Sequence, residues 1–151
     1  VVAFANLAGA VGLAVLVWLA DHASTNDGAV GRAAVRIATA KVQLPWEVAF
    51  FRGALCNVLV CMAVWMAMAA RSVTDKLAAV VLPVTAFVAA GFEHSIANMY
   101  FFPLAMLLGA PIGVADAMRN LAVVIAGNIV GGSVLVALVY WLIYLRPQRG
   151  A

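Results

Sequence analysis

Charged side chains are scarce in this chain of 151 residues. Asp, Glu, Lys and Arg make up 10% of the sequence, whereas hydrophobic residues make up 67%. A soluble domain averages about 25% charged and about 45–50% apolar residues, and a soluble chain this apolar would expose patches that aggregate. The composition therefore excludes an ordinary cytoplasmic enzyme and a disordered tail, and it indicates a membrane protein.

Basic residues are few and dispersed, although the formal net charge is +3. Nucleic-acid grooves require a basic patch with interleaved aromatic side chains, and the sequence contains no such patch. We therefore expect no nucleic-acid partner.

Cysteine and histidine are also sparse, with two of each. Cys56 and Cys61 lie in one apolar run, and a five-residue helical spacing places them about 140° apart around the axis. This spacing suits neither a disulfide nor a zinc site, so both are interpreted as small buried apolar residues. We expect no metal, no cofactor and no enzymatic activity.

The chain begins inside an apolar run at Val1, without a methionine or the basic segment that opens a signal peptide. Residues 146–151 form a polar ending. We therefore expect the sequence to be the C-terminal part of a longer membrane protein, with residues 1–151 in a single transmembrane domain.

Long apolar runs dominate what is present, and a membrane-spanning helix needs about 20 such residues. The runs that meet this length are residues 1–20, 48–70 and 121–145. The last run ends with Trp141 and Tyr144 next to Arg146, a pattern typical of a membrane interface. We predict an all-α membrane protein.

The apolar run 77–108 is too long for one comfortable span. Pro83 lacks a backbone donor and Gly91 permits a sharp turn. We predict two short helices joined by a loop inside the membrane, with the break near residues 83–93. A broken helix at this depth indicates a transport site, because irregular backbone there must be buried in protein or line water.

The basic residues between the spans bear on orientation. One side would carry Arg71, Lys76, Arg146 and Arg149. The other side would carry Arg32, Arg36, Lys41 and Arg119. The counts are equal, and the higher density in the shorter segments favours a cytoplasmic C-terminus in a multi-pass inner-membrane protein.

Polar side chains within the apolar runs are candidates for function because they are costly at membrane depth. Asn6 is interpreted as a packing residue. Asn57 and Asn128 either link packed helices or line a pore, and both interpretations remain open. Gly127 and Gly131 beside Asn128 form a small-residue surface that predicts close helix packing.

His94 is the strongest candidate for a functional residue, since it follows the predicted break. We predict it in the first turn of the second half-helix, with Asn98 on the same face. The N-terminus of a half-helix attracts anions, and a histidine there can exchange a proton with one. The alternative is a neutral histidine that packs against a neighbouring carbonyl.

Three residues close to His94 in the sequence are Glu93, Phe92 and Phe87. A carboxylate would repel an anion, so Glu93 is interpreted as a clamp that caps free N–H groups at the break. Phe87 and Phe92 either pack or form an apolar gate, which would exclude hydrated ions and pass small desolvated solutes.

Four segments together resemble one family. They are Gly91–Met99, Phe51–Trp65, Gly127–Gly132 and Tyr140–Arg146. In order and spacing they are similar to the formate/nitrite transporters, and among these to bacterial formate channels. The resemblance implies an aquaporin-like bundle of inverted repeats, of which this chain supplies about the last four of six spanning elements. It also implies a homopentamer in the lipid bilayer that passes small monovalent anions, formate or nitrite.

The resemblance assigns roles to individual residues. His94 matches the central pore histidine, and Asn57 and Asn128 match pore-lining asparagines. Phe87 matches the aromatic residue of the cytoplasmic constriction, and Lys41 matches a basic residue beside the periplasmic vestibule.

Glu93 and Asn98 match the fixed neighbours of that histidine. We expect an anion, most simply formate, to meet His94, which pairs with it or protonates it. A water or glycerol channel is a rival, but its paired Asn-Pro-Ala motifs are absent from this sequence. A haem-binding or structural subunit is another rival, which would need a second histidine on a facing helix, whereas His22 lies in a loop.

Overall fold

The computed structural model describes residues 2–146, so the polar ending predicted for residues 146–151 lies almost wholly outside the described residues. Regular structure in residues 2–146 is helical, as the sequence predicts. The contacts divide this part of the chain into two compact units. The first unit comprises residues 2–49 and 94–123, and the second unit comprises residues 50–93 and 124–146.

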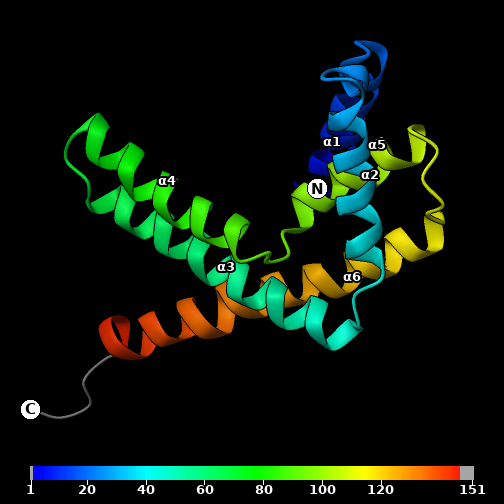
Figure 1. The fold of residues 1–151 in the computed structure, drawn as a ribbon. Coiled ribbons are helices and arrows are strands. Elements are labelled where there is room, and N and C mark those ends of the chain that lie inside the picture. The colour runs from blue at the N-terminus through cyan, green and yellow to red at the C-terminus, as the bar shows by residue number, and fades with distance from the viewer. Residues whose placement is uncertain (1, 147–151) are drawn as a thin grey trace, which may run out of the picture. The chain divides into compact units, whose positions relative to one another are not determined.

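The helices follow one another along the chain with short connections (Figure 1). They are α1 (Val2–Leu19), the 3-10 turn η1 (His22–Ser24), α2 (Ala29–Val42), α3 (Trp46–Ala69), α4 (Val73–Ala89), α5 (Ser95–Leu107) and α6 (Val114–Val130). Two π-type stretches, η2 (Gly131–Leu138) and η3 (Trp141–Leu145), continue α6.

Three helical stretches in the described part of the chain are long and apolar enough to cross a membrane. They are α1, α3 and the continuous stretch Val114–Leu145. They overlap the apolar runs 1–20, 48–70 and 121–145, and the last stretch begins earlier than its run, at Val114. The polar residues before position 121 form the first turns of α6, which apolar composition alone does not reveal.

The connection between the first two apolar runs contains a helix of its own, α2. Ala34 and Ala38 are buried one turn apart, while Arg32 and Arg36 are exposed at the same spacing. This is the pattern of an amphipathic helix, in which residues four apart share a face. The sequence contained this signal, but the sequence analysis used the basic residues of this connection only to predict orientation and did not predict the helix.

The first unit is built around α5, which packs against α1 and α2 (Figure 1). Its core brings together Ala14 of α1, Ala34 of α2 and Leu104 of α5. Tyr100 of α5 and Leu108, the C-cap residue that follows α5, pack against that core. Two of the three core residues are alanines, so the helix backbones approach closely.

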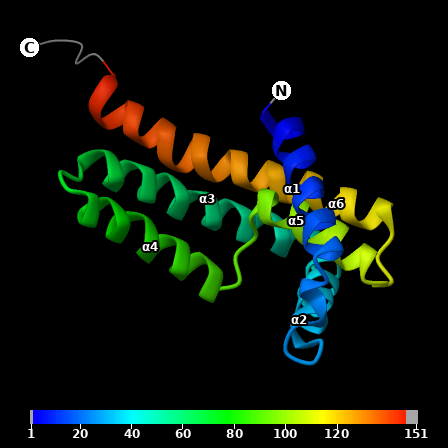
Figure 2. The same cartoon turned by 90° about the horizontal axis from the view of Figure 1, so that it is seen from above.

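In the second unit, α4 runs back along α3 after a tight turn, as Figure 2 shows. Ser72 opens α4 with a capping box: its hydroxyl accepts from Asp75 N–H at 3.0 Å, and its own N–H donates to the Asp75 carboxylate at 3.2 Å. Such a cap satisfies N–H groups that the first helical turn leaves without intrahelical partners.

Helices α3 and α6 of the second unit touch through their backbones. A Cβ atom at Gly127 would clash with the carbonyl oxygen of Phe50, and one at Gly131 would clash with the carbonyl oxygen of Ala54. The prediction that these glycines permit close helix packing is therefore confirmed. Cys56 is fully buried on α3, as expected for a small apolar residue, whereas Cys61 is only partly buried, contrary to the expectation for both cysteines.

Candidate functional site

The run 77–108 is interrupted between α4 and α5, at residues 90–94. Helix α4 ends in a Schellman motif: Gly91 N–H donates to Val88 C=O at 3.1 Å, and Phe92 N–H donates to Phe87 C=O at 3.0 Å. Gly91 has φ +67°, a conformation that glycine adopts without strain. The backbone therefore turns here because Gly91 follows the last helical turn.

Pro83 takes no part in this break, contrary to the prediction that the interruption begins there. It is buried inside α4, which continues for six more residues to Ala89. A proline removes one helical hydrogen bond, and helices in membranes tolerate that loss when neighbouring groups satisfy the freed carbonyl.

His94 is the N-cap residue of α5, one position before the first turn in which we expected it. Its Nδ1 accepts a hydrogen bond from Ala97 N–H at 3.4 Å. Because Nδ1 accepts, the proton of the neutral ring is on Nε2, which leaves Nε2 as a donor. The first turn of α5 contains no acidic residue, so its own side chains do not offset the partial positive charge of the helix N-terminus.

Glu93 precedes this cap and is buried, with 2% of its surface exposed. Its backbone N–H donates to Arg52 C=O at 3.3 Å, and its C=O accepts from Asn128 Nδ2 at 3.0 Å. These two backbone bonds hold the chain at the break, whereas the capping role expected of the Glu93 carboxylate stays a prediction. The side-chain cap on Ala97 comes from His94.

Asn57 and Asn128 meet in the second unit. Asn57 Nδ2 donates to Asn128 C=O at 2.6 Å. Asn128 Nδ2 donates to Gly53 C=O at 2.8 Å as well as to Glu93 C=O. Both N–H groups of the Asn128 amide are thus directed to carbonyls, and the amide links α3, α6 and the break.

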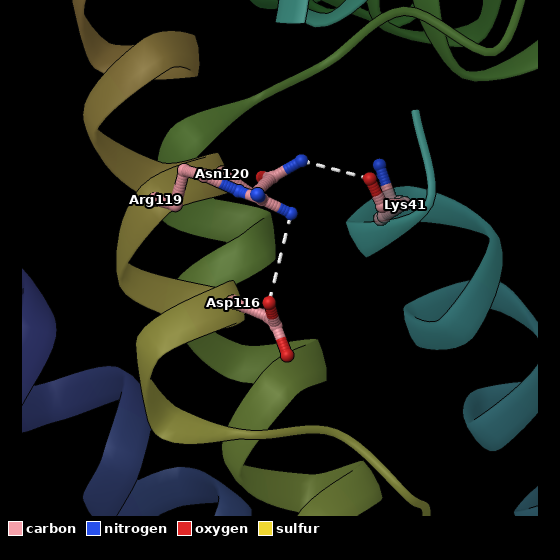
Figure 3. Close-up of polar contacts among 4 residues, drawn as sticks. All are labelled: Lys41, Asp116, Arg119 and Asn120. Atoms are coloured by element: carbon pink, nitrogen blue, oxygen red, sulfur yellow. Dashed lines mark hydrogen bonds and ion pairs between the residues drawn. The ribbon is translucent and has the colours of Figure 1, made fainter. Parts of the chain in front are cut away.

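A second polar cluster lies in the first unit, and Figure 3 shows its bond between Asn120 and Lys41. Asn98 Nδ2 donates to Asn120 Oδ1 at 3.0 Å, and Asn120 Nδ2 donates to Lys41 C=O at 2.8 Å. Asn98 is fully buried and Asn120 is 6% exposed. This chain of bonds connects the first turns of α5 to the last turn of α2 through α6. We call it the Asn98–Asn120–Lys41 chain.

Asn120 is a site residue that the sequence analysis missed. It stands next to Arg119, whose guanidinium pairs with Asp116 at 3.6 Å on the exposed side of α6 (Figure 3). The available signal was an amide directly before the apolar run 121–145. Its position beside charged residues made it resemble an ordinary solvated helix end.

The predicted site residues therefore fall into two groups. The first unit holds His94, Asn98 and Lys41, and the second unit holds Asn57, Asn128, Glu93 and Phe87. Phe87 is half-buried, and its carbonyl closes the Schellman motif. Among residues 2–146 no cluster of three His, Cys, Asp or Glu side chains could hold a metal ion.

Comparison with known proteins gives a consistent result. Residues 1–142 match the family described as formate/nitrite transporter. The formate channel FocA of Escherichia coli strain K12 is 40% identical over 164 residues, which cover 96% of this chain and 58% of the relative. A probable formate transporter of Methanothermobacter thermautotrophicus is 42% identical over 154 residues, covering 93% of this chain and 56% of the relative. The chain thus spans less than two thirds of these relatives.

Solved structures agree in fold. A pentameric formate channel with formate bound superposes with a TM-score of 0.87 at 38% identity, covering 96% of this chain and 64% of that channel. An ion channel of the same family has a TM-score of 0.79 at 36% identity, covering 90% of this chain and 54% of that one. The all-helical chain therefore has the aquaporin-like fold of these channels.

Proposed function

The chain belongs to the formate/nitrite transporter family, and from this premise we propose that it passes formate across a membrane through a pore in which His94 meets the anion. The family consists of multi-pass membrane channels and transporters, and its members are not enzymes. The relatives named for formate, together with the solved channel that contains formate, favour this anion over nitrite.

The observation that carries the proposal is the capped break before α5. The break leaves the N-terminus of α5 inside the apolar run 77–108, and His94 occupies its N-cap position. N–H groups and a partial positive charge at such a terminus attract a carboxylate without adding a fixed charge that would trap it.

In the neutral form, His94 offers its Nε2–H to the anion while Nδ1 holds the cap on Ala97. In the protonated form, Nδ1 also carries a proton, which would point at the Ala97 N–H, so the ring must leave the cap. Transfer of one proton from the imidazolium to formate yields neutral imidazole and formic acid. The acid then crosses an apolar constriction and releases its proton to water.

The remaining residues have supporting roles in this proposal. Lys41 draws anions towards the entrance, and Phe87 contributes to the apolar constriction. Asn57 supplies hydrogen bonds in place of lost water. Asn128 acts chiefly through the helix-linking bonds of its amide, because both of its N–H groups are already directed to carbonyls.

The assembly is also proposed from the relatives. The solved formate channel is pentameric, and we propose a homopentamer with one pore in each protomer. We propose that the C-terminus lies in the cytoplasm, since the shorter segments on that side carry the denser positive charge.

The test is formate flux in proteoliposomes, measured for the wild-type protein and two histidine variants. His22 is the other histidine of the sequence and lies in the exposed turn η1, so His22→Phe is the matched control for His94→Phe. We expect wild-type flux and pH profile for His22→Phe. His94→Phe should lose flux or its pH dependence.

Two results would count against the proposal. Wild-type flux and pH profile in folded His94→Phe would remove His94 from the mechanism. Absence of formate flux in folded wild-type protein would overturn the function itself. Nitrite flux and glycerol-driven swelling, measured on the same vesicles, separate this channel from its two transport rivals.

A further inference from the structure

Asn120 has a placement that the proposed function does not use. It lies nearly buried near the start of α6 and holds groups on two other helices of the first unit. Its Oδ1 accepts from the Asn98 side chain on α5, and its Nδ2 donates to Lys41 C=O on α2. Both the oxygen and the nitrogen of this buried amide are hydrogen-bonded. Moving the side chain would be costly, because a polar group that stays buried without a hydrogen bond has lost its contact with water and gained nothing in return.

The two bonds of Asn120 lead towards His94 and Lys41, two of the three candidate residues of the first unit. Asn98 N–H donates to His94 C=O at 3.0 Å, and the Asn98 side chain donates to Asn120. Asn98 therefore connects Asn120 to the N-cap residue of α5. Lys41 C=O belongs to the last turn of α2 and also accepts from Leu44 N–H at 3.3 Å. Three consecutive hydrogen bonds therefore join the backbone of His94 to the backbone of Lys41.

Lys41 lies in the last turn of α2 and His94 is the N-cap of α5, and these two helices pack against each other, so the lysine charge acts on the imidazole. The strength of that action depends on their separation, since the Coulomb energy falls with distance and rises in a low-dielectric surrounding. The Asn98–Asn120–Lys41 chain is the set of bonds that ties the two helix ends carrying these side chains.

We propose that Asn120 is a positioning residue: by bonding Lys41 C=O and Asn98 at once, it sets the separation between the Lys41 ammonium and the His94 ring. This inference rests on the proposed function and adds to it a residue that does not contact the anion. Through that separation, Asn120 affects how strongly Lys41 and His94 attract formate.

Asn120→Asp tests this inference with the smallest change of shape. The aspartate keeps an oxygen that accepts from Asn98, and it places a second oxygen against Lys41 C=O in place of the N–H donor. Asn120→Leu removes both bonds. Asp116→Asn is the matched control, because it breaks the exposed ion pair one turn earlier on the same helix.

The readout is the dependence of formate flux on formate concentration in proteoliposomes. Residues that share one network typically couple strongly enough to change an equilibrium by about three- to tenfold. We expect Asn120→Asp to raise the half-saturating concentration by about that factor, with maximal flux within about twofold of wild type. Asp116→Asn should leave both quantities unchanged.

A double-mutant cycle separates positioning from a merely structural role. If Asn120 acts through Lys41, Asn120→Asp should produce no further shift in a Lys41→Met background. A purely structural defect would instead lower thermal stability and maximal flux in both backgrounds and leave the half-saturating concentration at its wild-type value.

The inference is overturned if folded Asn120→Asp has the wild-type half-saturating concentration, or if its shift persists in full in the Lys41→Met background. Asn120→Asp keeps the test decisive if Asn120→Leu does not fold. A wild-type protein without formate flux would overturn the proposed function itself, whereas normal wild-type flux with an unshifted Asn120→Asp variant overturns this inference alone.

Discussion

Replacing Gly131 with alanine should destabilise the protein, although alanine is the better helix former. A Cβ atom at this position would lie 2.8 Å from the carbonyl carbon and 2.9 Å from the Cα of Ala54, and it would clash with the Ala54 oxygen. All three atoms are backbone, so the two helices must separate to admit it. Overpacking of this kind costs about 1–3 kcal/mol, against a gain of at most about 1 kcal/mol in helix propensity.

Gly12→Ala on α1 is the matched control, because no heavy atom lies within 4 Å of its added Cβ. That variant gains propensity without a clash. The assay is the thermal midpoint of each purified protein in the same mild detergent. We expect Gly131→Ala to melt several degrees below wild type, at about 2–4 °C per kcal/mol, and Gly12→Ala to melt at or above wild type.

The reasoning would be refuted if Gly131→Ala and Gly12→Ala shifted the midpoint equally, because the backbone contact would then contribute nothing. Gly127→Ala provides a second instance of the same contact, at Phe50, and should change the midpoint in the same direction as Gly131→Ala.

Two further substitutions test other local bonds by the same thermal assay. Ser72→Ala removes the hydroxyl of the capping box on α4 and should cost about 1 kcal/mol, whereas Ser72→Asp should restore the acceptor and most of the stability; an unchanged midpoint for Ser72→Ala would show that the cap is not formed. Asn128→Leu removes the donors to Gly53 C=O and Glu93 C=O and should cost about 1–3 kcal/mol, because two carbonyls each lose one hydrogen bond; a midpoint at or above wild type would instead favour a mainly pore-lining amide.

Much of the helical architecture could be predicted because apolar length is a direct physical requirement of a membrane span. The same argument identified a break, since the run 77–108 exceeds one span. It misplaced the beginning of that break at Pro83, because a proline within a helix loses only one bond when neighbours satisfy the freed carbonyl. Gly91 determined the position, since only the residue after the last turn needs a positive φ.

The sequence indicated which residues are candidates for the site, but it could not predict their hydrogen-bond partners. His94 was identified from its place after the break, yet the sequence could not show that its own Nδ1 would cap α5. Asn128 left a packing role and a pore role equally open, and the directions of its two N–H groups favour packing. Such bonds depend on which backbone carbonyls three-dimensional packing brings near.

Asn120 is a residue whose role the sequence did not reveal. Its position beside Arg119 and Asp116 suggested a solvated helix end, and only the packing of α2 and α5 against it makes it a buried link. A sequence pattern describes one helix at a time, whereas the linking role of Asn120 depends on the packing of three helices, α2, α5 and α6.

The most direct test of the central claim is a ¹⁵N NMR measurement of the His94 imidazole in lipid bilayers, with and without formate. The signal is assigned by difference against His94→Asn, in a His22→Phe background that removes the other histidine of this sequence. We predict a neutral ring with the proton on Nε2 and an unprotonated Nδ1, and a formate-dependent shift that is larger at Nε2. A ring protonated on Nδ1 in the absence of formate, or Nε2 unaffected by formate at saturating flux, would contradict the account.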